Sequence, residues 1–189
     1  MSKKVVAIYG SHRKNGNSNY VMDTLLDAIP GEDVEIQKYY LSGMDINPCT
    51  GCFHCRADGI CMHKDDMPGL LDAIMQADKV ILTIPVFMFQ ASGTVKQFID
   101  RCYPLLEGVN GHYTNRMAPK DTVLIYSQGA PVPQTFQPYM DMNKTSLGLL
   151  NFNVIETIVC TAANEIGAAK DKTELCEYAA KVGVSLFSE

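Results

Sequence analysis

The sequence lacks three features that would place it in other protein classes: a long hydrophobic run, an excess of basic residues and an internal repeat. Its longest apolar run, residues 80–89, is interrupted by Thr83 and Pro85 and has about half the length that a membrane-spanning helix requires. The apolar stretch at residues 5–9 is shorter than the hydrophobic region of a signal peptide. With 16 basic and 21 acidic side chains, the net charge of −5 argues against non-specific binding to nucleic acid or anionic membranes. We therefore expect a soluble, cytoplasmic protein with no nucleic-acid or membrane partner.

Chain length and cysteine content set the next limits. The 189 residues suit one domain with a sizeable core, and no linker divides them, so we expect residues 1–189 to form a single domain. The seven cysteines are an odd number. In a reducing compartment they indicate thiols, metal ligands or redox chemistry rather than a disulfide framework.

Apolar, β-branched runs alternate along the chain with patterns of helical period. Strand-like runs cover residues 4–9, 34–41, 80–84, 122–126 and 154–159. Helical patterns cover residues 18–29, a segment from 67 onward that Asp65 and Asp66 precede as caps, a segment from 92 or 94 to 102, a Met-containing segment after 131, and 175–187. Residues 107–120 read as a long polar loop. The alternation predicts a three-layer α/β fold with a five-stranded parallel sheet of order 2-1-3-4-5, in which ligands bind beside the loops after strands 1 and 3.

The loop after the first strand, residues 10–18, is typical of a phosphate site. It carries two basic side chains, and it places backbone N–H groups at the start of a helix. Three known phosphate motifs do not match it: His12 breaks the dinucleotide fingerprint, five residues rather than four separate Gly10 from Gly16, and no cysteine nucleophile is present. An ordinary polar surface connection is the alternative interpretation.

Two further segments meet the same predicted sheet edge. Strand 3 runs into Phe87, Met88 and Phe89, which suit stacking on a planar ring, although an aromatic run there can equally be core. The fourth strand runs into small polar residues at 127–130. A phosphate loop and an aromatic platform together suggest a mononucleotide with a planar ring, hence FMN.

Five motifs carry a resemblance to a known family: Gly-Ser-x-Arg-Lys-x-Gly-Asn-Ser at 10–18, a cysteine run at 47–55, Asp-Asp-Met at 65–67, Pro-Val-Phe at 85–87 and Val-Lys-Gln-Phe-Ile-Asp-Arg at 95–101. With these motifs the sequence resembles the flavodoxin-like NAD(P)H-dependent FMN reductases and their iron-sulfur flavoprotein relatives, from the first strand to about Gly129. The resemblance implies a flavodoxin-like fold, NAD(P)H as co-substrate, and a homodimer or homotetramer with the flavin near a subunit boundary.

The resemblance also implies the residues that contact FMN. The phosphate contacts are Ser11, Arg13, Asn17 and Ser18. The ring contacts are Pro85, Val86, Phe87, Met88 and Phe89 on one side and Ser127, Gln128 and Gly129 on the other. Two positions depart from the family pattern: Phe87 stands where relatives often have Tyr, so that hydroxyl is absent, and His12 replaces the usual Pro.

The loop after the second strand holds Cys49, Cys52, Cys55 and Cys61, spaced by two, two and five residues. This spacing suits a 4Fe-4S cluster better than zinc, which usually takes two separated Cys-x-x-Cys pairs, although His54 and His63 keep zinc open. A redox dithiol of Cys52 and Cys55 is a third interpretation. A loop that keeps these cysteines for packing, without metal, is the fourth.

The remaining candidates have simpler interpretations. Cys102, Cys160 and Cys176 lie in helical or strand patterns and are expected to be buried apolar residues. Lys96 and Arg101 are expected to pair with Asp100 or, as the resemblance implies, to serve a subunit contact. His112 is expected to be a solvated loop histidine rather than a substrate contact.

We therefore expect an FMN-dependent oxidoreductase that passes electrons from NAD(P)H to a small-molecule or protein acceptor such as flavin, a quinone or a nitroaromatic. The cofactor carries the chemistry, so no catalytic acid or base is predicted. Two alternatives stay open at this point. One is an electron carrier with a 4Fe-4S cluster on the cysteine loop, and the other is a non-redox binding module of the same fold.

Overall fold

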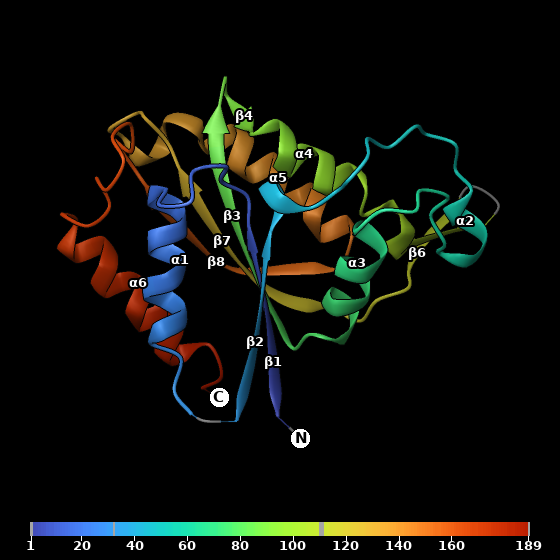
Figure 1. Cartoon of the computed structure of the whole chain (residues 1–189), viewed down its shortest axis with the longest axis horizontal. Coiled ribbons are helices and arrows are strands. Elements are labelled where there is room, and N and C mark those ends of the chain that lie inside the picture. The colour runs from blue at the N-terminus through green and yellow to red at the C-terminus, as the bar shows by residue number, and fades with distance from the viewer. Residues whose placement is uncertain (1, 32, 110–111, 189) are drawn as a thin grey trace.

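The centre of the molecule is a parallel β-sheet, seen in a computed structural model that describes residues 2–31, 33–109 and 112–188 (Figure 1). Its strands stand in the order β2-β1-β3-β7-β8, which confirms the predicted order 2-1-3-4-5. Strand β4 (Gln90–Ala91) was not predicted, and it pairs antiparallel with the end of β3. The five parallel strands are β1 (Lys3–Tyr9), β2 (Val34–Tyr40), β3 (Lys79–Phe87), β7 (Lys120–Ser127) and β8 (Phe152–Cys160).

Helices cover both faces of the sheet, as a three-layer fold requires (Figure 1). Helices α1 (Asn17–Asp27) and α6 (Thr173–Ser185) pack on one face. Helices α3 (Met67–Gln76), α4 (Gly93–Asp100) and α5 (Gln137–Leu149) pack on the other. Successive residues of β1 point to opposite faces, so Val5 and Ala7 join the first core and Val6 and Ile8 join the second. The three-layer α/β architecture is therefore as predicted.

A small lobe beyond α3 replaces the predicted polar loop at 107–120. Strands β5 (Leu106–Val109) and β6 (His112–Asn115) form an antiparallel pair, so the loop prediction was wrong there, and His112 lies on a strand. The helix α2 (Cys55–Asp58) packs against β5. Side chains hold the lobe: Arg116 donates to the backbone oxygen of Arg56 at 2.8 Å, and Arg56 donates to the Tyr113 hydroxyl at 2.7 Å.

Three short 3-10 helices complete the path: η1 (Leu41–Gly43), η2 (Tyr103–Leu105) and η3 (Pro133–Phe136). Within the part of the chain that the structure describes, no helix combines the length and the hydropathy needed to span a bilayer.

Candidate functional site

A groove opens at the carboxyl-terminal edge of the sheet, where the loops after β1, β3, β7 and β8 meet. Its volume is about 160 Å³. Nine of the twelve residues predicted to contact FMN line it; Ser18, Met88 and Phe89 do not. We call this the sheet-edge groove, and its lining residues are Ser11, Arg13, Gly16, Asn17, Pro85, Val86, Phe87, Ser127, Gln128, Gly129, Ala163 and Asn164.

The loop after β1 turns tightly into α1. The N–H of Gly10 donates to the Thr83 hydroxyl at 2.8 Å, and a Cβ at Gly10 would lie 2.2 Å from the Thr83 carbonyl oxygen, so only glycine lets β1 end this close to β3. The N–H of Gly16 then donates to the Arg13 carbonyl oxygen at 2.9 Å. The result is a compact loop that presents the amino-terminal end of an eleven-residue helix to the groove.

Asn17 reaches the groove, but its amide group is already engaged. Its Nδ2 donates to the backbone oxygens of Ala163 at 3.1 Å and Glu165 at 2.8 Å, and its Oδ1 accepts from the N–H of Ala169 at 3.0 Å. The side chain therefore ties the start of α1 to the segment after β8. Ser18 is buried in the first turn of α1, away from the groove.

The loops after β7 and β8 close the far side of the groove. The Arg13 guanidinium crosses toward them and donates to the Asn164 carbonyl oxygen at 3.0 Å. Gly129 gives Asn164 the space it occupies, because a Cβ there would lie 2.3 Å from the Asn164 Oδ1. Sequence reasoning missed Ala163 and Asn164. The available signal was their position just after the last strand, since parallel strands all end at the same edge.

Gln128 lines the groove, and its side chain is bonded to the backbone of the loop after β7. Its side chain is buried, and Nε2 donates to the Val132 carbonyl oxygen at 2.8 Å. Its Oε1 is buried with no hydrogen-bond partner among the described residues. A buried acceptor left unpaired costs free energy, and because this oxygen is shielded from the groove, the role of Gln128 there is to fix the loop after β7.

The aromatic side chains at the end of β3 and in the turn after it are exposed rather than core. Phe87 is 61% exposed, and Met88 and Phe89 are 91% and 69% exposed. Positive φ angles at Met88 (46°) and Phe89 (67°) turn the chain back into β4. Phe89 packs edge-on against Phe136, with ring centroids 5.0 Å apart. The core interpretation of these three residues is wrong, whereas Pro85 and Val86, just before them in β3, are buried.

The four loop cysteines line a second, smaller cavity of about 50 Å³, together with Arg101, Tyr103 and His63. All seven cysteines of the chain are free thiols. Burial and then the neighbouring Cys61 raise the pKa of the Cys55 thiol, whereas hydrogen bonds from the backbone of His54 and the side chain of Thr50 lower the pKa of the exposed Cys52. We call this the cysteine cavity, and residues 47–63 the cysteine loop.

The family model of NADPH-dependent FMN reductases matches residues 3–130, more than half of the chain. The chain belongs to this family. The match ends just after β7, so it includes the first three segments of the sheet-edge groove and the whole cysteine loop.

Individual proteins are similar over part of the chain. An iron-sulfur flavoprotein of Archaeoglobus fulgidus is 32% identical over 78% of this chain and 64% of its own length. An iron-sulfur flavoprotein of Methanocaldococcus jannaschii is 36% identical over 56% of this chain and 54% of its own length. The match thus spans between half and two thirds of these relatives.

Among solved structures, an FMN-dependent NADH-azoreductase of Bacillus anthracis in complex with FMN superposes with a TM-score of 0.74, covering 96% of this chain and 98% of that chain. The sequences are 10% identical, so this likeness shows the fold, which is the flavodoxin-like fold that the sequence predicts.

Metal binding by the cysteine cavity is not shown. Within residues 2–31, 33–109 and 112–188, no three His, Cys, Asp or Glu side chains are arranged to hold a metal ion. The zinc interpretation relied on His54 and His63, and only His63 is among the residues that line the cavity.

The structure confirms some of the remaining residue predictions for this FMN reductase family member and contradicts others. Cys102 and Cys160 are buried, as predicted, and burial raises the pKa of Cys160 to about 11. The same prediction was wrong for Cys176, which is only partly buried because it lies on the outer helix α6. The expected Lys96–Asp100 ion pair is confirmed at 2.6 Å. The pairing of Arg101 with Asp100 was wrong, because Arg101 points into the protein and pairs with Asp65. Helical numbering alone could not show this inward direction.

Proposed function

We propose that the chain is an FMN-dependent oxidoreductase that takes electrons from NAD(P)H and passes them to a small-molecule or protein acceptor. The observation that carries the proposal is the sheet-edge groove, in which a helix amino terminus, the Arg13 guanidinium and the exposed Phe87 ring lie around one space. Family membership and the FMN in the Bacillus anthracis structure support it.

Each part of the groove has a task that its chemistry suits. Ser11, Arg13 and the first N–H groups of α1 bind a phosphate by charge-assisted hydrogen bonds. Pro85, Val86 and Phe87 flank one side of a planar ring, and Ser127, Gln128 and Gly129 flank the other. When bound, FMN supplies hydride and one-electron chemistry, and the protein orients the ring and excludes water.

The exposed residues beside the groove fit the oligomer that we expect. Met88 and Phe89 project from the β3–β4 turn at the groove margin, where a second copy of the chain would remove them from water. We extend the proposal to a homodimer or homotetramer whose subunits meet near the flavin.

Substitution of two neighbouring basic residues, Arg13 and Lys14, tests the phosphate site. Arg13 lines the groove, and Lys14 carries the same charge one residue on without lining it. We expect Arg13→Gln to weaken FMN binding by about tenfold or more, because a charge-assisted hydrogen bond to phosphate is lost. Lys14→Gln should change it by less than about twofold. Flavin fluorescence titration of the purified, flavin-free protein measures both.

Riboflavin, which has no phosphate, supplies the internal control. Because Arg13 also donates to the Asn164 carbonyl oxygen, Arg13→Gln should weaken riboflavin binding too, but by less than FMN binding, and the excess loss for FMN measures the phosphate contact. Reduction of the bound flavin by NADPH or NADH, followed by absorbance without oxygen, then tests the activity. A wild-type protein that binds neither flavin contradicts the proposal and favours the non-redox binding module.

The cysteine cavity favours a second candidate function, an iron-sulfur flavoprotein that carries electrons. Four thiols that line one cavity, one of them beside a buried guanidinium, form a donor set that suits a 4Fe-4S cluster. The similar Archaeoglobus and Methanocaldococcus proteins are both described as iron-sulfur flavoproteins. Iron and sulfide content after anaerobic reconstitution tests the candidate. Cys55→Ser should abolish uptake, and Cys176→Ser, on α6, should not.

A further inference from the structure

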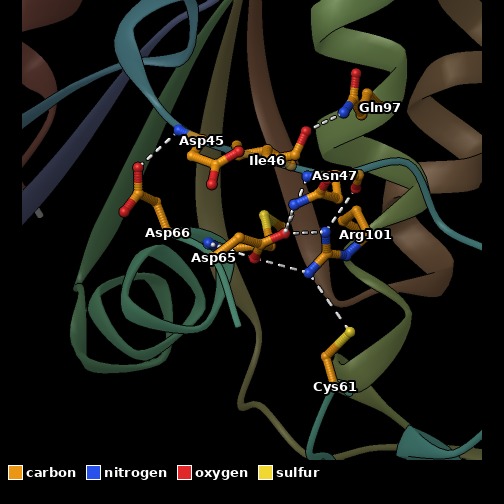
Figure 2. A network of polar contacts seen from close by, with 9 residues as sticks. Asp45, Ile46, Asn47, Cys61, Asp65, Asp66, Gln97 and Arg101 are labelled. Carbon is orange, nitrogen blue, oxygen red and sulfur yellow. Dashed lines mark hydrogen bonds and ion pairs between the residues drawn. The ribbon is translucent and has the colours of Figure 1, made fainter. Parts of the chain in front are cut away.

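Arg101 is a charged side chain held almost completely inside the protein. It follows the last residue of α4 and is 1% exposed. Its Nη1 lies 2.6 Å from Asp65 Oδ2, and its Nη2 lies 3.0 Å from Asp65 Oδ1, so the two groups meet in a two-point ion pair (Figure 2). Nη1 also donates to the Asn47 carbonyl oxygen at 2.6 Å. One guanidinium therefore contacts Asn47 at the start of the cysteine loop and Asp65 just after its end.

Further hydrogen bonds close the same two ends on each other (Figure 2). Asp65 accepts from the N–H of Asn47 at 2.9 Å and from the N–H of Met67 at 3.2 Å. Asp66 was predicted to cap α3, but its carboxylate accepts from the N–H of Asp45 at 2.7 Å, and Asp65 makes the bond to the helix. Gln97, one turn before Arg101 on α4, donates to the Ile46 carbonyl oxygen. We call residues 45–47 and 64–67 the stem of the cysteine loop. These contacts hold the stem together before any group binds the cysteines.

The third contact of Arg101 reaches a cysteine. Nη2 donates to Cys61 Sγ at 3.4 Å, within the range of an N–H···S hydrogen bond (Figure 2). Because Asp65 engages both terminal nitrogens, the guanidinium plane is fixed, and with it the direction of this bond. Arg101 is itself a lining residue of the cysteine cavity.

A stability role alone explains this arrangement poorly. Removing two charges from water costs several kcal/mol per ion, and replacing a buried ion pair by apolar residues of similar size is often neutral or stabilising. What an apolar pair cannot do is accept the Asn47 N–H, donate to the Asn47 oxygen and donate to a sulfur at once. The contacts therefore point to orientation of the loop.

We propose that Arg101, held by Asp65, is a positioning residue that orders the cysteine loop in the absence of metal and donates an N–H···S hydrogen bond to Cys61 that raises the reduction potential of a bound cluster. The ordering of the loop is independent of metal, whereas the effect on potential rests on the proposed iron-sulfur function. Hydrogen bonds to ligand sulfurs are among the factors that set cluster potentials, and they favour the reduced, more negative state.

The first test uses the metal-free full chain and trypsin, because the cysteine loop and its stem contain Arg56 and Lys64 as cleavage sites. Arg101→Lys keeps the charge but cannot reach Asp65, Asn47 and Cys61 together. We expect cleavage after Arg56 and Lys64 to become at least about tenfold faster, since local opening costs less free energy. Lys96→Gln, which breaks the exposed pair on the same helix, should leave the rates unchanged. Equal rates in Arg101→Lys and wild type overturn the loop-ordering part.

The second test measures the midpoint potential of the reconstituted cluster by an anaerobic redox titration. Arg101→Lys should lower it relative to wild type. Gln97→Ala releases the loop stem at Ile46 without touching Cys61, so it should leave the potential unchanged. A wild-type potential in Arg101→Lys overturns the sulfur bond as a tuning contact. A wild-type protein that takes up no iron or sulfide contradicts the iron-sulfur function instead, and the trypsin result still decides the first part.

If Arg101→Lys does not fold, the double variant Arg101→Met with Asp65→Asn removes both charges at once and leaves no uncompensated charge inside. The same two outcomes then apply: faster cleavage and a lower potential support the proposal, and wild-type values in both overturn it.

Discussion

The buried carboxylate of Asp65 is subject to two opposing effects on its pKa. The hydrogen bonds from Arg101 lower the pKa well below the ordinary value of about 3.9, and they outweigh burial, which raises it. A carboxyl group whose folded-state pKa is depressed contributes stability that is present above the unfolded pKa and is lost as the pH falls below it. The ion pair should therefore make the protein sensitive to acid below about pH 4.

Asp65→Asn tests this sign. At pH 7 the variant should be less stable than wild type by about 3 kcal/mol, because it leaves the Arg101 charge unpaired. As the pH falls to about 3, the difference should shrink, since wild type loses the contribution that the variant already lacks. Urea unfolding at the two pH values measures it. A difference that stays constant with pH contradicts the assignment.

The seven thiols should differ in reactivity. Cys52 is exposed, and the hydrogen bonds from the His54 backbone and the Thr50 side chain lower its pKa, so it holds more thiolate at neutral pH. Burial raises the pKa of Cys102 and Cys160. In the metal-free protein we expect iodoacetamide to modify Cys52 at least about tenfold faster than these two. Peptide mass spectrometry over time measures the order, and early labelling of Cys160 contradicts it.

At the residue scale, the sequence predicted which residues lie at the site better than it predicted which groups those residues bond. The family resemblance implied the nine groove residues, and the rule that loops leaving parallel strands share an edge located only the loops that carry them. The partner of Arg101 was missed because Asp65 lies 36 positions away, and only the tertiary fold brings the two together. Asn17 was assigned to a phosphate from its motif, yet its amide group is bonded to the segment after β8.

At the scale of the elements, the close packing of helices α1 and α6 requires a glycine at position 183. A Cβ at Gly183 of α6 would lie 2.1 Å from the Leu25 carbonyl oxygen of α1, which is backbone and cannot swing away. We expect Gly183→Ala to destabilise the fold by about 2 kcal/mol, because the two helices must separate. Gly148 on α5 has open space around its Cα, so Gly148→Ala should stabilise by up to about 1 kcal/mol. Thermal unfolding of the two variants compares them directly, and equal effects contradict the packing argument.

Element prediction from the sequence was accurate where hydrophobic periodicity was strong. Strands β1, β3 and β7 are buried runs flanked by turns, which is the pattern that apolar spacing detects, whereas the edge strands β2 and β8 were recognised from weaker patterns. Strands β4, β5 and β6 are two to four residues long, and the described residues of β6 are all exposed, so neither length nor alternation marked them. Side-chain contacts from Arg56 and Arg116 hold that lobe, and periodicity carries no information about them.

At the scale of the whole molecule, the sheet-edge groove lies where the loop after the first strand meets the segment after the last strand. Residues of the first loop lie against residues that follow the last strand, outside the stretch that the family model covers. Arg13 and Asn17 both reach across this junction, to Asn164 and to Ala163 and Glu165. A ligand in the groove therefore contacts the loop after β1 and the segment after β8 at once, and these two segments meet only in the folded protein. Binding should raise the stability of the entire chain.

Substitution of Asn17 distinguishes a direct contact with the FMN phosphate from a role in positioning the segment after β8. If its amide acts by holding the segment after β8, Asn17→Ala should weaken FMN and riboflavin alike, by about tenfold, since the whole far wall of the groove loosens. Asn153→Ala removes the same group from an exposed asparagine at the start of β8, where it bonds Asp121, and should change neither affinity. Fluorescence titration with both flavins measures the ratio. A loss confined to FMN would instead assign Asn17 to the phosphate, as the resemblance implies, and would show that the wall keeps its shape without that amide.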